Sequence, residues 1–185
     1  DLFLDFYLAT GDPDNSTLAP NRMFRNDGGK RFQDVTSSGG FGHLQKGHAV
    51  AFADFDNDGD QDVFALMGGA YTGDTARSVL FENPGHGNHW IKLKLEGVQS
   101  NRAAIGARIK LVVENAKGTR AIYKTVNSGG SFGSNPLRQE IGLGDAAAIK
   151  SAEIFWPATG KTQSVSDLQP DHAYSVKEGA SKPVL

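Results

Sequence analysis

The sequence predicts an all-β protein in two parts, a repeat part over residues 1–86 and a separate C-terminal domain over residues 87–185. Three observations support this fold class. Apolar and polar residues alternate in many short segments, helical spacing is convincing nowhere, and 23 glycines favour tight turns between short strands. Because 38% of the residues are hydrophobic, the chain has enough apolar side chains for a packed core.

Charge and composition exclude several classes of partner. The net charge is -2, from 19 basic and 21 acidic residues, so no overall field attracts nucleic acid or an anionic membrane. No apolar run approaches the roughly 18 residues of a membrane span, and a signal peptide is absent from this sequence. The lack of cysteine excludes disulfides and thiolate metal sites. We therefore expect a globular protein that does not bind nucleic acid and has no membrane span.

The repeat part contains two pairs of similar segments. "DLFLDFYLATGD" resembles "DVFALMGGAYTGD" and aligns Asp1 with Asp62, an offset of 61 residues. "NRMFRNDGG" resembles "SVLFENPGHG" and aligns Asn26 with Asn83, an offset of 57, so a loop four residues shorter in the second copy would reconcile the two. The repeat part would then hold one complete repeat and the tail of another, and such units stack or close into a ring. We expect a C-terminal piece of a longer protein.

The C-terminal domain is predicted from four strand-like segments. In "NHWIKLKLEGV", Ile91 and Leu93 alternate with Trp90 and Lys92, which is typical of a half-buried strand. "GARIKLVVENAKGTRAIYKTV" predicts a hairpin that turns at "NAKG". "SAEIFWP" and "HAYSVKEG" add two strands, the first ended by Pro157. The domain is expected to be a small antiparallel β-sandwich or barrel.

The segment "AFADFDNDGDQDVFAL" places five aspartates in nine positions between two apolar runs. In an extended strand, alternate aspartates would lie on one face about 6.6 Å apart and repel one another. In a curled loop, residues 1, 3 and 5 converge, the carbonyl of residue 7 joins them, and glycine at position 6 allows the turn of a Ca²⁺ site. The predicted ligands are Asp54, Asp56, Asp58, the main-chain oxygen of Asp60, and Asp62.

An EF-hand does not explain this loop, because position 12 is Ala65 and the flanks "HAVAFA" and "DVFALM" resemble strands. The sequence favours a loop across a β-hairpin, whose all-oxygen ligands suit Ca²⁺ better than Mg²⁺. A solvated acidic turn is the alternative. Without a bidentate glutamate the affinity would lie in the millimolar range, which suits an extracellular or periplasmic location.

Two resemblances follow from these motifs. "GHAVAFADFDNDGDQDVFALMGG" followed by "LFENPG" resembles a VCBS or FG-GAP repeat, the calcium-loop blade of integrin-type β-propellers. Residues 88–179, with "SNRAAIGARIKL" and "EIFWPATGKTQ", resemble the ASPIC/UnbV domain of bacterial secreted proteins and cartilage acidic protein. They imply a partial β-propeller with one metal site, followed by a small β domain, in a secreted protein whose remaining propeller lies upstream. Asp1 and Asp5 would belong to a blade whose metal loop is missing.

Other residues have two interpretations each. His86 and His89 form an HxxH, either a transition-metal pair or part of a junction loop. His48 either faces a ligand or is a hydrogen-bonded structural histidine. For Trp90 and Trp156 we expect core or interface packing rather than sugar stacking.

The segment "NSGGSFGSNP" (127–136) is expected to be a surface loop, with ligand contacts as the alternative, because it lacks the lysine of a phosphate-binding loop.

No GxSxG nucleophile elbow is predicted, because the letters occur only in "GGSFG" (129–133) and no helix is expected to follow them there. We therefore expect a non-catalytic, Ca²⁺-stabilised binding or adhesion module for a glycan or an extracellular protein. One alternative is an accessory enzyme or biosynthetic protein with a pocket at the domain junction, lined by His48, His89 or Arg102. Another is a structural cap, in which the C-terminal domain protects the last blade of the propeller.

Overall fold

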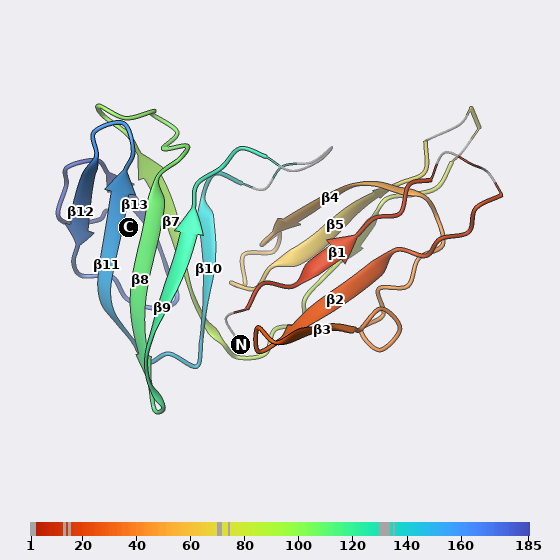
Figure 1. The fold of residues 1–185 in the computed structure, drawn as a ribbon, viewed down its shortest axis with the longest axis horizontal. Helices are drawn as coiled ribbons and strands as arrows, with labels where there is room; N and C mark the ends of the chain where they lie inside the picture. Colours follow the sequence, from red (N-terminus) through yellow and green to blue (C-terminus); the bar gives the residue numbers. More distant parts are fainter. Residues whose placement is uncertain are drawn as a thin grey trace.

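The chain is all-β over the residues that the structure, a computed structural model, describes. These are residues 3–12, 14, 16–69, 72–73, 75–129, 134 and 136–185. Thirteen strands form four sheets in this part of the chain, which confirms the predicted fold class. Strands β1–β6 lie in one part and β7–β13 in the other (Figure 1). None of the described segments forms a helix of the length and apolarity needed to cross a membrane.

The repeat part consists of two three-stranded antiparallel sheets. The first has the order β1-β2-β3, and its strands are β1 (Phe6–Leu8), β2 (Arg22–Asp27) and β3 (Arg31–Asp34). The second has the order β4-β5-β6, and its strands are β4 (Gly47–Ala53), β5 (Asp62–Met67) and β6 (Val79–Phe81). Both sheets contribute to one core, whose buried residues are Tyr7, Met23, Val63, Ala65 and Met67. Strands β4 and β5 are the two predicted flanks of the aspartate loop.

The structure corrects the alignment of the two repeats. The carboxylate of Asp5 accepts a hydrogen bond from the amide of Asn26 at 2.7 Å, and Asp62 accepts the equivalent bond from Asn83 at 2.8 Å. Strand pairing agrees, since β1 pairs with β2 in the register in which β5 pairs with β6. Asp62 therefore corresponds to Asp5, not to Asp1, and the offset of 57 residues holds throughout. The proposed four-residue difference in loop length is wrong.

The C-terminal domain is a sandwich of two sheets. One has the order β10-β7-β13, and its strands are β7 (His89–Glu96), β10 (Gln139–Gly144) and β13 (His172–Lys177). The other has the order β12-β11-β8-β9, and its strands are β8 (Arg108–Asn115), β9 (Gly118–Thr125), β11 (Ala148–Trp156) and β12 (Lys161–Val165). Apolar side chains from both sheets meet in a core that includes Ile91, Leu93, Ile109, Leu111, Ile154 and Trp156.

The predicted strands of this domain are all present. The hairpin β8–β9 turns between Asn115 and Gly118, at the "NAKG" segment, and β11 ends one residue before Pro157. One pairing differs from the expected antiparallel arrangement, because β13 runs parallel to β7. Parallel neighbours need a long connection, and β13 follows β7 only after all the other strands of the domain.

Candidate metal centre

The aspartate loop joins the ends of a β-hairpin. Ala53, the last residue of β4, pairs with Asp62, the first residue of β5, so the chain leaves and returns at the same point. Two residues of the loop have positive φ, Asn57 at 65° and Gly59 at 101°. Glycine and asparagine tolerate this conformation best, so the segment curls instead of continuing as a strand.

Three of the five predicted ligands converge. Asp54, Asp56 and Asp58 each offer a carboxylate oxygen, and these oxygens all lie within 4.8 Å of one another. Ca²⁺ ligands lie about 2.4 Å from the ion, so two oxygens on opposite sides of it are about 4.8 Å apart. The spacing of the three carboxylates therefore fits a single Ca²⁺ ion.

Asp54 is the buried member of this cluster, with 5% of its surface exposed. Its Oδ2 accepts a hydrogen bond from the amide of Gly59 at 2.9 Å and forms an ion pair with Lys92. Its Oδ1 is buried and has no hydrogen-bond partner among the described residues. A buried carboxylate oxygen without a partner is costly, and a cation held together with Asp56 and Asp58 would satisfy it.

The other two predicted ligands are placed differently. Asp62 is buried, and its two oxygens accept hydrogen bonds from the amides of Phe55, at 2.9 Å, and Asn83, at 2.8 Å. It holds the loop to β5 and to Asn83, two residues after the end of β6, and it is not part of the converging cluster. Burial, and then the nearby carboxylate of Asp58, raise the pKa of Asp60. The role of the Asp60 main-chain oxygen as a ligand stays a prediction.

The C-terminal domain contacts the loop directly, which the sequence did not predict. A side chain at Gly59 would collide with the indole of Trp90, and Lys92 forms its ion pair with Asp54. Glu140 Oε2 accepts hydrogen bonds from the amide of Asp54 at 3.1 Å and from Gln61 Nε2 at 3.0 Å. The alternation in β7 placed Trp90 and Lys92 on the side of the sheet away from the domain core, but gave no sign of what covers that side.

The remaining sequence candidates have separate environments. His89 Nδ1 lies 2.7 Å from Asp171 Oδ2, and no metal-binding group among the described residues contains either His86 or His89. His48 Nε2 is buried without a hydrogen-bond partner in the described part of the chain. The loop 127–136 includes residues 130–133 and 135, which lie outside the described residues, so the expectation for it has no outcome.

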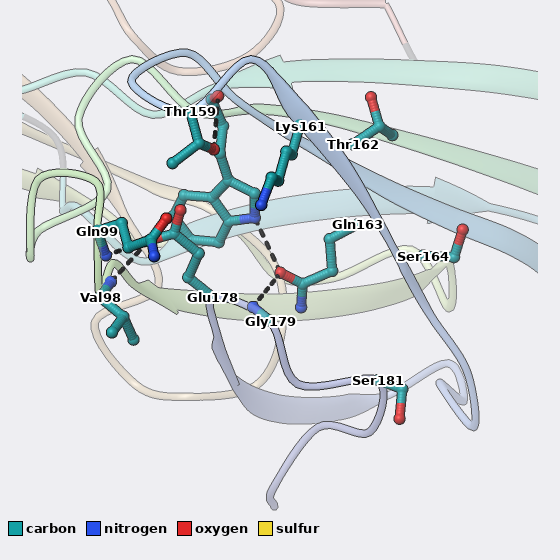
Figure 2. Close-up of a pocket in the computed structure, with 11 residues that line it drawn as sticks. Val98, Gln99, Thr159, Lys161, Thr162, Gln163, Ser164, Glu178, Gly179 and Ser181 are labelled. Carbon is teal, nitrogen blue, oxygen red and sulfur yellow. Dashed lines mark hydrogen bonds between the residues drawn. The ribbon is translucent and has the colours of Figure 1, made fainter.

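Both tryptophans pack as predicted. Trp90 lies against Gly59 at the domain junction, and Trp156 is buried in the sandwich core. The Trp156 indole donates a hydrogen bond to Gln163 Oε1 at 2.9 Å, beside a hollow of about 470 Å³. Figure 2 labels Gln163 and Glu178 among the residues that line this hollow. In the same hollow Glu178 Oε2 accepts hydrogen bonds from three consecutive amides, those of Val98, Gln99 and Ser100. These bonds, the one from Ser100 foremost, lower the pKa of Glu178 to about 2.

A larger cavity, of about 1330 Å³, lies at the junction of the two parts. The repeat part lines it with aromatic side chains such as Phe41 and Phe81, and the C-terminal domain with Lys124 and Arg138. Burial lowers the pKa of Lys124. The described residues that line the cavity do not include His48, His89 or Arg102, the three suggested for a junction pocket.

Comparison with known families finds one match in each part of the chain. Residues 1–65, a range that includes the aspartate loop, match the family model of the FG-GAP-like repeat. Residues 97–183 match the family model of ASPIC and UnbV. The chain combines an FG-GAP-like segment with an ASPIC/UnbV-like one. FG-GAP repeats are typical of extracellular proteins. No curated protein matches the chain. The finer likenesses to VCBS repeats and to cartilage acidic protein stay predictions.

Proposed function

We propose that the protein is a Ca²⁺-stabilised extracellular binding module, without catalytic activity, for a glycan or another protein. The observation that carries the proposal is that Asp54, whose carboxylate converges with those of Asp56 and Asp58, has a buried Oδ1 without a partner among the described residues. Asp54, Asp56, Asp58 and the main-chain oxygen of Asp60 would hold the ion. When bound, the ion supplies positive charge, which removes the repulsion among the loop carboxylates.

The affinity is expected to be weak, because position 12 is Ala65 and supplies no bidentate carboxylate. Calcium at about ten times its Kd should stabilise the fold by about 1.4 kcal/mol. For a chain of this size, that corresponds to a rise in Tm of about 3–6 °C. Isothermal titration calorimetry to 10 mM CaCl₂ and thermal unfolding in calcium or EDTA test this. An unchanged Tm and no binding heat would contradict the metal site.

The binding role needs a separate experiment. Arrays of glycans and of cell-surface proteins should be screened with the same protein in calcium and in EDTA. We expect ligands that bind in calcium and are lost in EDTA, because the loop would hold neighbouring segments in place only when its charge is neutralised. The absence of any ligand under both conditions would contradict a binding role while leaving the metal site intact.

The junction cavity supports a second candidate, an accessory enzyme or biosynthetic protein. Its volume is sufficient for a small organic molecule, and Lys124 and Arg138 provide cationic groups at its wall. A thermal-shift screen of small organic acids, repeated with Lys124→Met, tests this candidate. Stabilisation that the variant loses, together with a mass change in the bound compound, would favour an enzyme over an adhesion module.

A further inference from the structure

Lys92 is a buried ammonium group at the aspartate loop. It belongs to β7 of the C-terminal domain, and only 4% of its surface is exposed. Its Nζ pairs with Asp54 Oδ2 and lies 4.7 Å from the centre of the Trp90 ring. Lysine is almost never buried to this extent unless it is paired, so the position of Lys92 depends on the aspartate loop.

The neighbouring strand strengthens this contact. Glu140 in β10 is the cross-strand partner of Lys92, and it also reaches the loop, where it accepts hydrogen bonds from the Asp54 amide and from Gln61. The other carboxylate oxygen of Glu140, Oε1, forms an ion pair with Arg138 Nη2 at 2.7 Å. The C-terminal domain thus places a cation on the Asp54 carboxylate and an anion on the Asp54 amide, a charge pattern complementary to the loop.

Asp54 can serve Lys92 and a metal ion together. Its Oδ2 is used by Lys92 and by the amide of Gly59, whereas its Oδ1 has no partner among the described residues and is the oxygen left for an ion shared with Asp56 and Asp58. An ion bound through Oδ1 would therefore lie close to the Lys92 ammonium, on the other oxygen of the same carboxylate. The two cations repel each other, and little water separates them because Asp54 and Lys92 are both buried.

We propose that Lys92 is a resident cation of the aspartate loop that sets its affinity for divalent ions, so that the metal site is an interdomain site. This inference rests on the proposed function. Lys92 acts as a positioning residue through Asp54 and is not a ligand. Because it reaches the loop only when the C-terminal domain is docked, docking and metal binding are coupled. Each weakens the other by the same factor.

The coupling between docking and metal binding is unfavourable because the loop is already held in its curled form by hydrogen bonds. The bonds from Gly59 to Asp54, and from Phe55 and Asn83 to Asp62, hold the loop in its curled form. Metal binding therefore gains little from further ordering by the C-terminal domain, and charge repulsion decides the outcome. A unit charge about 6 Å from a divalent ion weakens binding at least about tenfold, even in the dielectric of water.

The test is calorimetric titration of CaCl₂ into the full chain and two variants. Lys92→Met removes the charge and keeps the apolar stem, and we expect it to bind calcium about tenfold more tightly than the wild type. Lys94→Met is the matched control, because Lys94 is exposed two residues further along the same strand. Its calcium affinity should stay within twofold of the wild type.

A second variant guards against misfolding of Lys92→Met. Lys92→Gln keeps an N–H donor for Asp54 without the charge, and it should also bind calcium more tightly and show a larger calcium-induced rise in Tm. Equal or weaker binding by the neutral variants, with binding by the wild type, would overturn the inference and leave the proposed function standing. Calcium binding by the two neutral variants, without detectable binding by the wild type, would support the inference. No binding by any of them would overturn both.

Discussion

At the scale of single residues, the five loop aspartates have different tasks despite their regular spacing. Asp54, Asp56 and Asp58 converge, whereas both oxygens of Asp62 accept bonds from backbone amides. The alternation and the glycine at position 6 predicted the curled loop. They did not predict the task of Asp62, because one of its partners, Asn83, lies beyond β6 and only the fold brings it near.

This difference predicts opposite behaviour for two asparagine variants. Asp62→Asn should lower the free energy of unfolding by about 2 kcal/mol in EDTA, because an amide group cannot accept both bonds. Asp56→Asn should leave the stability in EDTA unchanged or raised, since Asp56 is exposed and adds repulsion, but it should weaken the response to calcium. Urea unfolding in EDTA and in calcium measures both effects. Equal losses in EDTA would contradict the assignment.

Glu178 predicts a pH dependence of stability. Its folded-state pKa is lowered from 4.5 to about 2 by the three amides and by the Ser100 hydroxyl. A depressed pKa contributes stability that is present above about pH 4.5 and is lost as the pH falls towards 2. Glu178→Gln should therefore flatten the decline of Tm between pH 4.5 and 2, relative to the wild type. Glu153→Gln, at a half-buried glutamate of β11, supplies the control, and a slope in Glu178→Gln identical to that of the wild type would contradict the prediction.

At the scale of elements, alternation was sufficient to predict the strands but not their neighbours. Residues of β7 follow the expected pattern, with Ile91 and Leu93 in the core. The same pattern placed Lys92 on the outer side of the sheet, yet the aspartate loop of the other part buries it. Strand periodicity determines the side of a sheet, whereas burial of that side depends on contacts between distant segments.

The repeat alignment failed for a similar reason. Asp1 and Asp62 each begin a segment of similar sequence, but the hydrogen bonds and the strand register show that Asp62 is structurally equivalent to Asp5. Aspartate recurs at short intervals in this segment, so several offsets give comparable sequence matches. Only the backbone register distinguishes among them.

The contact between Gly59 and Trp90 predicts a strong effect of a single methyl group. In Gly59→Ala the new Cβ would collide with the indole, at a residue whose φ of 101° already strains any side chain. Gly179→Ala is the control, because Gly179 has a φ of 86° and no atom within 4 Å of the added Cβ. We expect Gly59→Ala to lower the Tm clearly more than Gly179→Ala and to change the fluorescence of Trp90. Equal losses would show that backbone strain alone acts at both sites.

At the scale of the whole molecule, the two sheets of the repeat part cover each other on one side only. Their outer faces expose large apolar side chains, which are Phe6, Leu8 and Phe32 on the first sheet and Phe64, Leu66 and Leu80 on the second. Exposed apolar clusters of this kind mark interaction surfaces. Equivalent strands of the two repeats share one register, so each outer face matches the kind of face that another repeat would pack against.

This arrangement predicts that residues 1–185 self-associate in solution. Burying a large apolar side chain contributes about 1.5–3 kcal/mol, so a contact between outer faces would gain stability from several residues together. Light scattering after size-exclusion chromatography should show species larger than a monomer at about 100 µM, and the double variant Phe64→Lys with Leu66→Lys should reduce them. Lys94→Met, at an exposed lysine on β7 of the C-terminal domain, should leave the distribution unchanged. A monomeric wild type at this concentration would contradict the prediction, and its outer faces would then tolerate exposure to water.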